Sequence, residues 1–127
     1  LSPADYLKKA NSITQVFAMI ETQAALDAVE EIAAVPGLDG LFVGPSDLSI
    51  ALSKGAGIDK TAKHTLDAMK LIAAAAAKNN LVAGAFAGSA DVINTYAAMG
   101  YTFMAGAVDV DLLQAGAESL IKAVKGV

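Results

Sequence analysis

Two acidic residues, Glu21 and Asp47, lie where an α/β protein usually carries its chemistry. Each follows a short apolar segment of β type, residues 14–20 and 39–43, and catalytic residues of parallel α/β folds come from the carboxyl ends of strands. Neighbouring strands lie about 4.8 Å apart, so both carboxylates can reach one ion. Two carboxylates suit a hard divalent cation such as Mg²⁺ or Mn²⁺, with water and a chelating substrate completing the shell.

The same two residues also have an ordinary structural interpretation. An acid just before a helix is favoured by the helix dipole, and Asp47 is a good N-cap for the short helix expected after it. Spacing alone therefore leaves both a metal site and a capping role open.

Residues 44–47, Gly-Pro-Ser-Asp, form the predicted exit loop of the second strand. Glycine lets a ligand approach the backbone closely, and the start of a helix presents free N–H groups to an anion such as a carboxylate. This segment therefore predicts either a docking site for an oxo-acid or a plain strand-to-helix turn.

The other candidate residues point to no second chemistry. His64 lies within a predicted helix and has no further His or Cys to complete a ligand set, so we expect it at the surface. All nine basic residues are lysines on predicted helices or loops, which disfavours a Schiff-base aldolase because that mechanism needs a desolvated lysine inside the pocket. The glycine-rich segments at 55–57 and 84–88 lack the context or spacing of a dinucleotide site.

Apolar β-type segments alternate with longer helical segments along the chain, which indicates repeated βα units and a parallel sheet. The expected elements are a short helix capped by Ser2 that ends at about residue 10, and strands at 14–20, 39–43, 81–85 and 101–105. Helices are expected at 22–34, 48–52, 60–78 and 89–99, and a final helix follows the last strand and ends at 124. Loops are short, so residues 1–127 are interpreted as a single domain.

Four consecutive βα units fit either an open doubly wound sheet or half of a (β/α)8 TIM barrel. A complete barrel needs about 250 residues. As a barrel, the chain is therefore expected to be a fragment, a half-barrel that pairs with another copy, or part of a longer protein.

The amino-acid composition indicates which binding partners and which cellular location to expect. Of the 127 residues 55% are hydrophobic and 17% charged, and the net charge is -4 with no Arg, so no nucleic-acid partner is expected. The absence of Cys fits a reducing compartment, and we expect a cytoplasmic location. Apolar segments are shorter than the roughly 18 residues of a membrane span, so no membrane partner is expected.

Met19-Ile20-Glu21-Thr22 and residues 35–49, Val-Pro-Gly-Leu-Asp-Gly-Leu-Phe-Val-Gly-Pro-Ser-Asp-Leu-Ser, closely resemble the class II (metal-dependent) pyruvate-type aldolases of the HpcH/HpaI family. That family includes 4-hydroxy-2-oxoheptanedioate and 2-dehydro-3-deoxyglucarate aldolases. Residues 81–84, 100–103 and 112–113 extend the resemblance along the whole chain. It implies a (β/α)8 barrel of which this chain is the carboxyl-terminal half, covering about the last four βα units.

The resemblance also implies roles for particular residues. Glu21 and Asp47 would bind the metal, Mg²⁺ or Mn²⁺ first, with Co²⁺ and Zn²⁺ as further candidates. Gly44, Ser46 and Asp47 would bind the pyruvate carboxylate, through the Ser46 and Asp47 amides. The family reaction is reversible aldol cleavage of a 4-hydroxy-2-oxo acid to pyruvate and an aldehyde, in which the metal stabilises the enolate. Members form dimers that assemble into hexamers by exchanging terminal helices, so a homo-oligomer is expected.

Some features depart from the family pattern. The catalytic Arg and His of the family lie in its amino-terminal half, so they are expected outside this chain. Met19 replaces the Gln that bacterial members tend to carry two residues before the metal-binding Glu, so the hydrogen bond of that Gln to the metal shell is not expected.

Two alternatives remain beside the aldolase. One is a non-catalytic half-barrel fragment or assembly module. The other is an acyl-CoA lyase similar to citrate lyase β, a group that shares the barrel and the acid pair but usually has Glu before the Asp. Pro45 and Ser46 favour the aldolase branch over these lyases.

Overall fold

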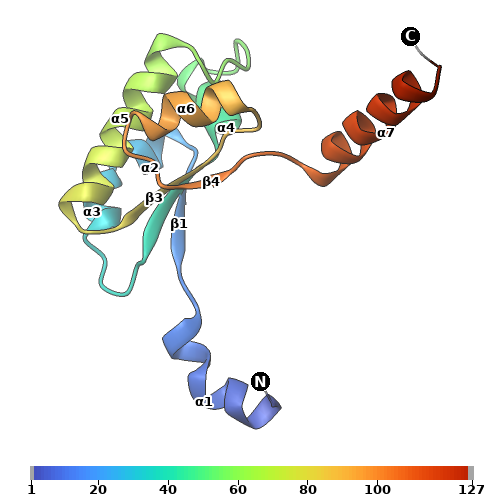
Figure 1. The fold of residues 1–127 in the computed structure, drawn as a ribbon. Helices are drawn as coiled ribbons and strands as arrows, with labels where there is room; N and C mark the ends of the chain where they lie inside the picture. The colour runs from blue at the N-terminus through green and yellow to red at the C-terminus, as the bar shows by residue number, and fades with distance from the viewer. Residues whose placement is uncertain (1, 126–127) are drawn as a thin grey trace.

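A computed structural model describes residues 2–125 as an α/β fold built on a four-stranded parallel sheet, with strand order β1-β2-β3-β4 (Figure 1). In chain order the elements are α1 (Pro3–Ile13), β1 (Phe17–Ile20), α2 (Gln23–Asp27), α3 (Val29–Ala33), β2 (Gly40–Val43), α4 (Pro45–Leu52), α5 (Lys63–Lys78), β3 (Val82–Phe86), α6 (Ala90–Ala97), β4 (Phe103–Ala105) and α7 (Asp109–Lys125). The predicted parallel βα repeat is confirmed.

Several predicted boundaries are shifted by up to three residues, as in α1, which ends at Ile13 and not near residue 10. Two predictions about the elements themselves are wrong. The helix expected over 22–34 is divided at Ala28 into α2 and α3, and this break lets both short helices turn apolar side chains onto the core. The exit loop expected over 44–47 is instead the first turn of α4, which begins at Pro45. Proline at the first helical position has the φ angle of a helix and lacks only an N–H that would have no partner there.

One face of the sheet is covered by helices and forms the core. Side chains that alternate along the strands point to this face, and they are fully or almost fully buried: Ile20, Leu41, Val43, Ala83 and Ala85. Helix α5 packs here through small residues, of which Ala75 and Ala76 are completely buried. Because the thin alanine side of α5 lies against a sheet rich in small residues, the helix approaches the strands closely.

The opposite face of the sheet is open and apolar. Met19, Phe42, Gly84 and Phe103 lie side by side in register across all four strands. A Cβ at Gly84 would lie only 2.8 Å from the Phe42 ring, so the missing side chain makes room for the two aromatic rings beside it. Phe103 packs against Phe17 and Phe42 with ring centroids 5.3 and 6.2 Å apart, yet Met19 and Phe103 remain 53% and 54% exposed.

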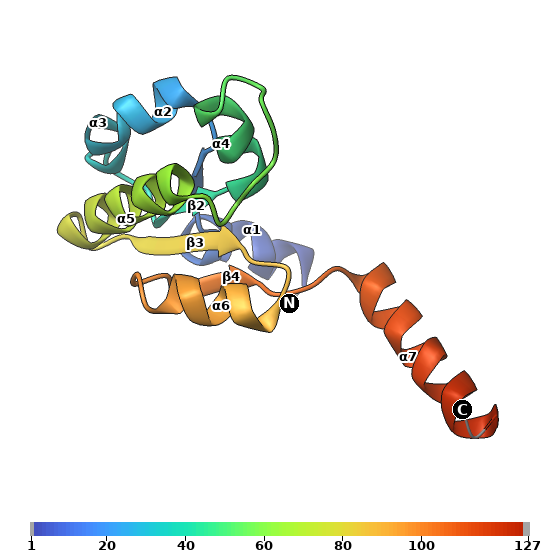
Figure 2. The same ribbon diagram turned by 90° about the horizontal axis from the view of Figure 1, so that it is seen from above.

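Helices α1 and α7 project from the body in different directions (Figures 1 and 2). Helix α1 has an N-cap at Ser2, whose hydroxyl accepts a hydrogen bond from the Asp5 amide, but it has no buried residue. Residues 109–124 of α7 are exposed throughout, including several large apolar side chains: Val110, Leu112, Leu113, Leu120, Ile121 and Val124. Within the described part of the chain, no helix is long and apolar enough to cross a membrane.

These exposed surfaces predict how residues 1–127 behave when expressed alone. The open sheet face and the sheet edges should drive self-association, because soluble proteins avoid leaving such surfaces uncovered. Light scattering should therefore find a dimer or larger aggregate. Replacing Met19 and Phe103 with Lys should shift the population toward monomer, whereas Leu71→Lys on the exposed side of α5 should not. A compact, cooperatively unfolding monomer of the unmodified sequence would contradict this expectation.

Candidate functional site

The carboxyl edge of the sheet ends in a row formed by Glu21, Gly44 and Phe86. Ile20, Val43 and Ala85 are paired in register, so the next residue of each strand continues that row. Side chains alternate between faces along a strand, so Glu21 and Phe86 belong to the same open face as Met19 and Gly84. The row therefore has a polar end at Glu21, just after β1, and an aromatic end at Phe86, the last residue of β3.

Gly44 is the place where the two predicted acids meet. A Cβ on Gly44 would lie 2.8 Å from Glu21 Oε2 and 3.5 Å from Asp47 Oδ2. The two carboxylate oxygens are therefore at most 6.3 Å apart, the sum of these two distances. A rotation of either side chain can bring them within the roughly 4 Å that separates opposite oxygen ligands of one Mg²⁺ ion. The space left by Gly44 and the hard oxygen donors fit a divalent cation.

Helix α4 supplies a second polar feature at the same position. Its N-cap is Gly44, which has no side chain to form a capping hydrogen bond, so the expectation that Asp47 is the N-cap is wrong. Asp47 stands instead in the first turn of the helix. The first N–H groups of a helix lack partners within the helix, and Pro45 has none, so the Ser46 and Asp47 amides are the first that can bind an anion.

The loop after α4 is fastened to the site by a buried serine. Ser49 is 1% exposed, and its hydroxyl donates to the Ser46 carbonyl at 2.7 Å and accepts from the Asp59 amide at 3.1 Å. The buried Thr65 hydroxyl donates to the Asp59 carbonyl at 3.1 Å. The Thr61 hydroxyl and amide donate to the Asp59 carboxylate and lower its pKa below the ordinary value. These bonds fix the loop relative to the start of α4.

The structure brings together some of the predicted residues and separates others. Glu21, Gly44, Ser46 and Asp47 lie at one edge, as the sequence predicts, whereas His64 is exposed on α5. Across residues 2–125, no group of three or more His, Cys, Asp and Glu side chains is arranged to bind a metal. Within these residues, Glu21 and Asp47 thus form a pair of carboxylates at Gly44 without a third such side chain.

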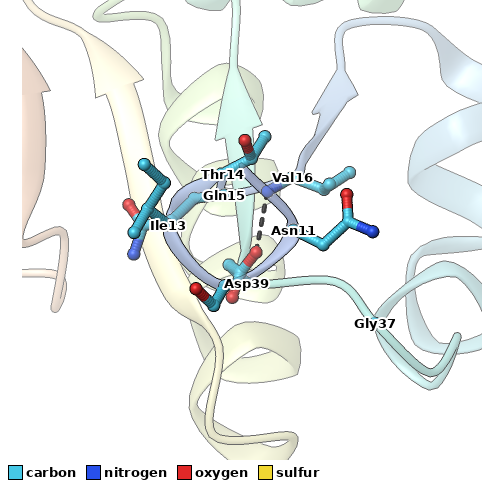
Figure 3. Close-up of a pocket in the computed structure, with 8 residues that line it drawn as sticks. Asn11, Ile13, Thr14, Gln15, Val16, Gly37 and Asp39 are labelled. Atoms are coloured by element: carbon cyan, nitrogen blue, oxygen red, sulfur yellow. Dashed lines mark hydrogen bonds between the residues drawn. The ribbon is translucent and has the colours of Figure 1, made fainter. Parts of the chain in front are cut away.

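A hollow of about 480 Å³ lies at the other end of the sheet, near the amino ends of β1 and β2 (Figure 3). It is lined by Asn11, Ser12, Ile13, Thr14, Gln15, Val16, Gly37 and Asp39. Its carboxylate is already engaged, because Asp39 accepts a hydrogen bond from the Val16 amide at 2.7 Å. Residues at the amino ends of the strands of such folds serve stability, so we place the functional site at the carboxyl edge.

Comparison with known families gives a match over most of the chain. Residues 2–115 match the family model described as HpcH/HpaI aldolase/citrate lyase. A solved structure described as an HpcH/HpaI aldolase/citrate lyase family protein from Burkholderia cenocepacia is similar with a TM-score of 0.84 and 33% identity, covering 98% of this chain and 48% of that one.

Curated relatives agree with that match. A 2-dehydro-3,6-dideoxy-6-sulfogluconate aldolase of Pseudomonas putida is 37% identical over 95% of this chain and 47% of its own length. A hydroxypyruvate/pyruvate aldolase of Rhizorhabdus wittichii is 33% identical over 91% of this chain and 46% of its own length. The chain thus spans about half the length of these relatives.

The buried serine allows a test of how the loop is positioned. Ser49→Ala leaves the Asp59 amide without its acceptor, so we expect a loss of about 1–3 kcal/mol in the free energy of unfolding. Hydrogen exchange at the Asp59 amide should accelerate in this variant. The exposed Ser12→Ala serves as control and should change neither measurement. Unchanged exchange at Asp59 would show that Ser49 does not fix this loop.

Proposed function

This chain belongs to the HpcH/HpaI aldolase/citrate lyase family, and we propose that the protein is a metal-dependent aldolase. The proposed reaction is reversible cleavage of a 4-hydroxy-2-oxo acid to pyruvate and an aldehyde. The observation that carries the proposal is the pair of carboxylates, Glu21 and Asp47, that share the space left by Gly44 beside the start of a helix.

Glu21 and Asp47 are the residues that would bind the metal, Mg²⁺ or Mn²⁺ in this proposal. When bound, such an ion supplies Lewis acidity to a 2-oxo group. Glu21 directly follows β1, and Asp47 lies in the first turn of α4, which begins just after β2. The pairing of β1 with β2 and the start of α4 therefore set the separation of the two carboxylates. Both are oxygen donors of the kind that hard divalent cations prefer.

The first turn of α4 would bind the other end of the 2-oxo acid. A carboxylate next to the amides of Ser46 and Asp47 receives hydrogen bonds and lies at the positive end of the helix dipole. Gly44 has no Cβ in the space between this turn and Glu21. An acid can therefore lie against the backbone while its oxo group faces the carboxylate pair.

A barrel for the whole protein is also part of the proposal. The open face of the sheet carries Met19, Phe42 and Phe103, which resembles the inward-facing layer of a (β/α)8 barrel before it closes. Because the relatives are about twice as long as this chain, four further βα units would cover that face. The catalytic Arg and His that this chain does not supply would come from those units.

The carboxylate pair is tested by replacing each acid with its amide. Glu21→Gln and Asp47→Asn each remove one of two protein anions, so calorimetry should show Mn²⁺ affinity reduced by at least roughly 10- to 100-fold, the cost of losing an outer-shell partner alone. Aldol cleavage should be abolished and the fold retained. Glu31→Gln, an exposed acid on α3, is the matched control. Unchanged Mn²⁺ affinity in both variants would contradict the metal site and leave these two acids with a structural role only.

The space at Gly44 is tested by filling it. Gly44→Ala places a methyl group 2.8 Å from Glu21 Oε2, so the carboxylate must move away. We expect weaker Mn²⁺ binding and a raised KM for the 2-oxo acid, with little change in stability because the displaced atom is the end of a flexible side chain. Gly57→Ala, where a Cβ meets nothing within 4 Å, should behave as the unmodified protein. Equal Mn²⁺ affinity in the two variants would contradict the shared site.

A further inference from the structure

Lys60 reaches from the loop between α4 and α5 to the carboxyl end of β3. Its Nζ lies 5.8 Å from the centroid of the Phe86 ring and 3.4 Å from the Ala87 carbonyl oxygen. The side chain is partly buried. An ammonium group over an aromatic face is attracted by the negative charge of the ring face, so the amine is directed toward the edge where the carboxylate pair lies.

The backbone of this lysine is fixed on both sides. The Asp59 amide just before it donates to the buried Ser49 hydroxyl. The Lys60 carbonyl accepts a hydrogen bond at 3.3 Å from the hydroxyl of Tyr96, a side chain that is 1% exposed. The α-carbon therefore has little freedom, and a ligand that binds the amine does not have to order the loop first.

The charge of Lys60 has no acidic partner within residues 2–125. The ion pairs formed there involve Lys63, Lys70 and Lys78 instead. Its carbonyl contact at 3.4 Å is long compared with the roughly 2.9 Å of a typical N–H···O bond. A partly buried ammonium with one weak acceptor gains most from an anion, because charge-assisted hydrogen bonds are about twice as strong as neutral ones.

The amine shares the open edge with the proposed metal site. Phe86, under the amine, stands in the same row as Glu21 and is two strand spacings from it, roughly 10 Å. Gly88 follows, and a Cβ there would lie 3.4 Å from Lys60 Nζ and 3.2 Å from the Phe86 ring. Because Gly88 has no side chain, a ligand can approach the amine and the ring together.

We propose that Lys60 binds an anionic group on the aldehyde portion of the substrate and so selects acidic aldehydes. This inference rests on the proposed function, in which the 2-oxo acid end lies at Glu21, Asp47 and the start of α4. The remainder of the substrate then extends along the edge toward β3, where the amine of Lys60 meets a carboxylate, phosphate or sulfonate. Lys60 acts here as a specificity-determining residue and takes no part in breaking the carbon–carbon bond.

The test compares pairs of aldehydes condensed with pyruvate by the protein expressed from its complete open reading frame, with Mn²⁺ present. Glyceraldehyde 3-phosphate against glyceraldehyde tests phosphate, and succinic semialdehyde against butanal tests carboxylate. The unmodified protein should favour the charged member of at least one pair. Lys60→Met should raise the KM of that charged aldehyde roughly 10- to 100-fold, as expected for a lost charged hydrogen bond, and leave the KM of the neutral aldehyde and both kcat values unchanged.

Two further variants separate charge from structure. Lys60→Arg retains the cation and should restore most of the preference. Lys54→Met removes an exposed lysine of the same loop and should behave as the unmodified protein. The proposal is overturned if the unmodified protein prefers neither charged aldehyde, or if Lys60→Met changes the KM values of charged and neutral aldehydes equally.

A second readout separates this inference from the proposed function. Lysine acetylation followed by mass spectrometry should show that glycerol 3-phosphate or succinate slows labelling of Lys60, that glycerol does not, and that labelling of Lys54 is unaffected. If the protein condenses none of the aldehydes, the aldolase proposal fails, and this protection alone decides whether Lys60 binds anions. Equal labelling of Lys60 with and without the anions would refute the anion site.

Discussion

The empty space at residue 44 is the constraint on which the arrangement of this edge depends. Glu21 extends from the end of β1 and Asp47 from the first turn of α4, and both carboxylates lie against the one position where the chain between them has no side chain. The register of β1 with β2 fixes the backbone next to Glu21, and Asp47 is placed by the helix that begins just after β2. A larger residue at this position would separate the two charges that any shared ligand must contact.

The two faces of the sheet have divided roles. The covered face contains the small and branched side chains that pack under α3, α4 and α5. The open face has aromatic rings and glycines in its middle, and it ends in Glu21, Gly44 and Phe86 at the carboxyl edge. Because alternate residues of a strand point to opposite faces, β1 ends in a core residue, Ile20, and the next residue, Glu21, is directed to the open face. The packing that fixes the strand therefore also orients the acid.

Polar groups around the edge are connected through the loop that follows α4. Ser49 joins the start of that helix to Asp59, and the next residue along, Lys60, reaches back over Phe86. Through these contacts the loop connects the start of α4 with the end of β3. The carboxyl edge of the sheet thus has two carboxylates at one end and the amine of Lys60 about two strand spacings away. This separation of opposite charges suits a ligand that differs chemically at its two ends.

Much of this could be predicted from the sequence, because the signals are local. Apolar segments followed by helical ones specify a parallel sheet, and an acid directly after such a segment must lie at its carboxyl end, which places Glu21 and the Gly44 to Asp47 segment correctly. The start of α4 at Pro45 was also a local signal, since proline is favoured at the first position of a helix.

The break at Ala28 had no such signal in the sequence, because no Gly or Pro marks it and packing on the core produces it. The sequence also predicted that the two carboxylates lie near each other, but their distances from the Gly44 position and the contact of Lys60 with Ala87, 27 residues away, were decided by the tertiary structure alone. Such contacts depend on how separate strands and loops are placed in space, and the spacing of residues along the chain does not contain that information.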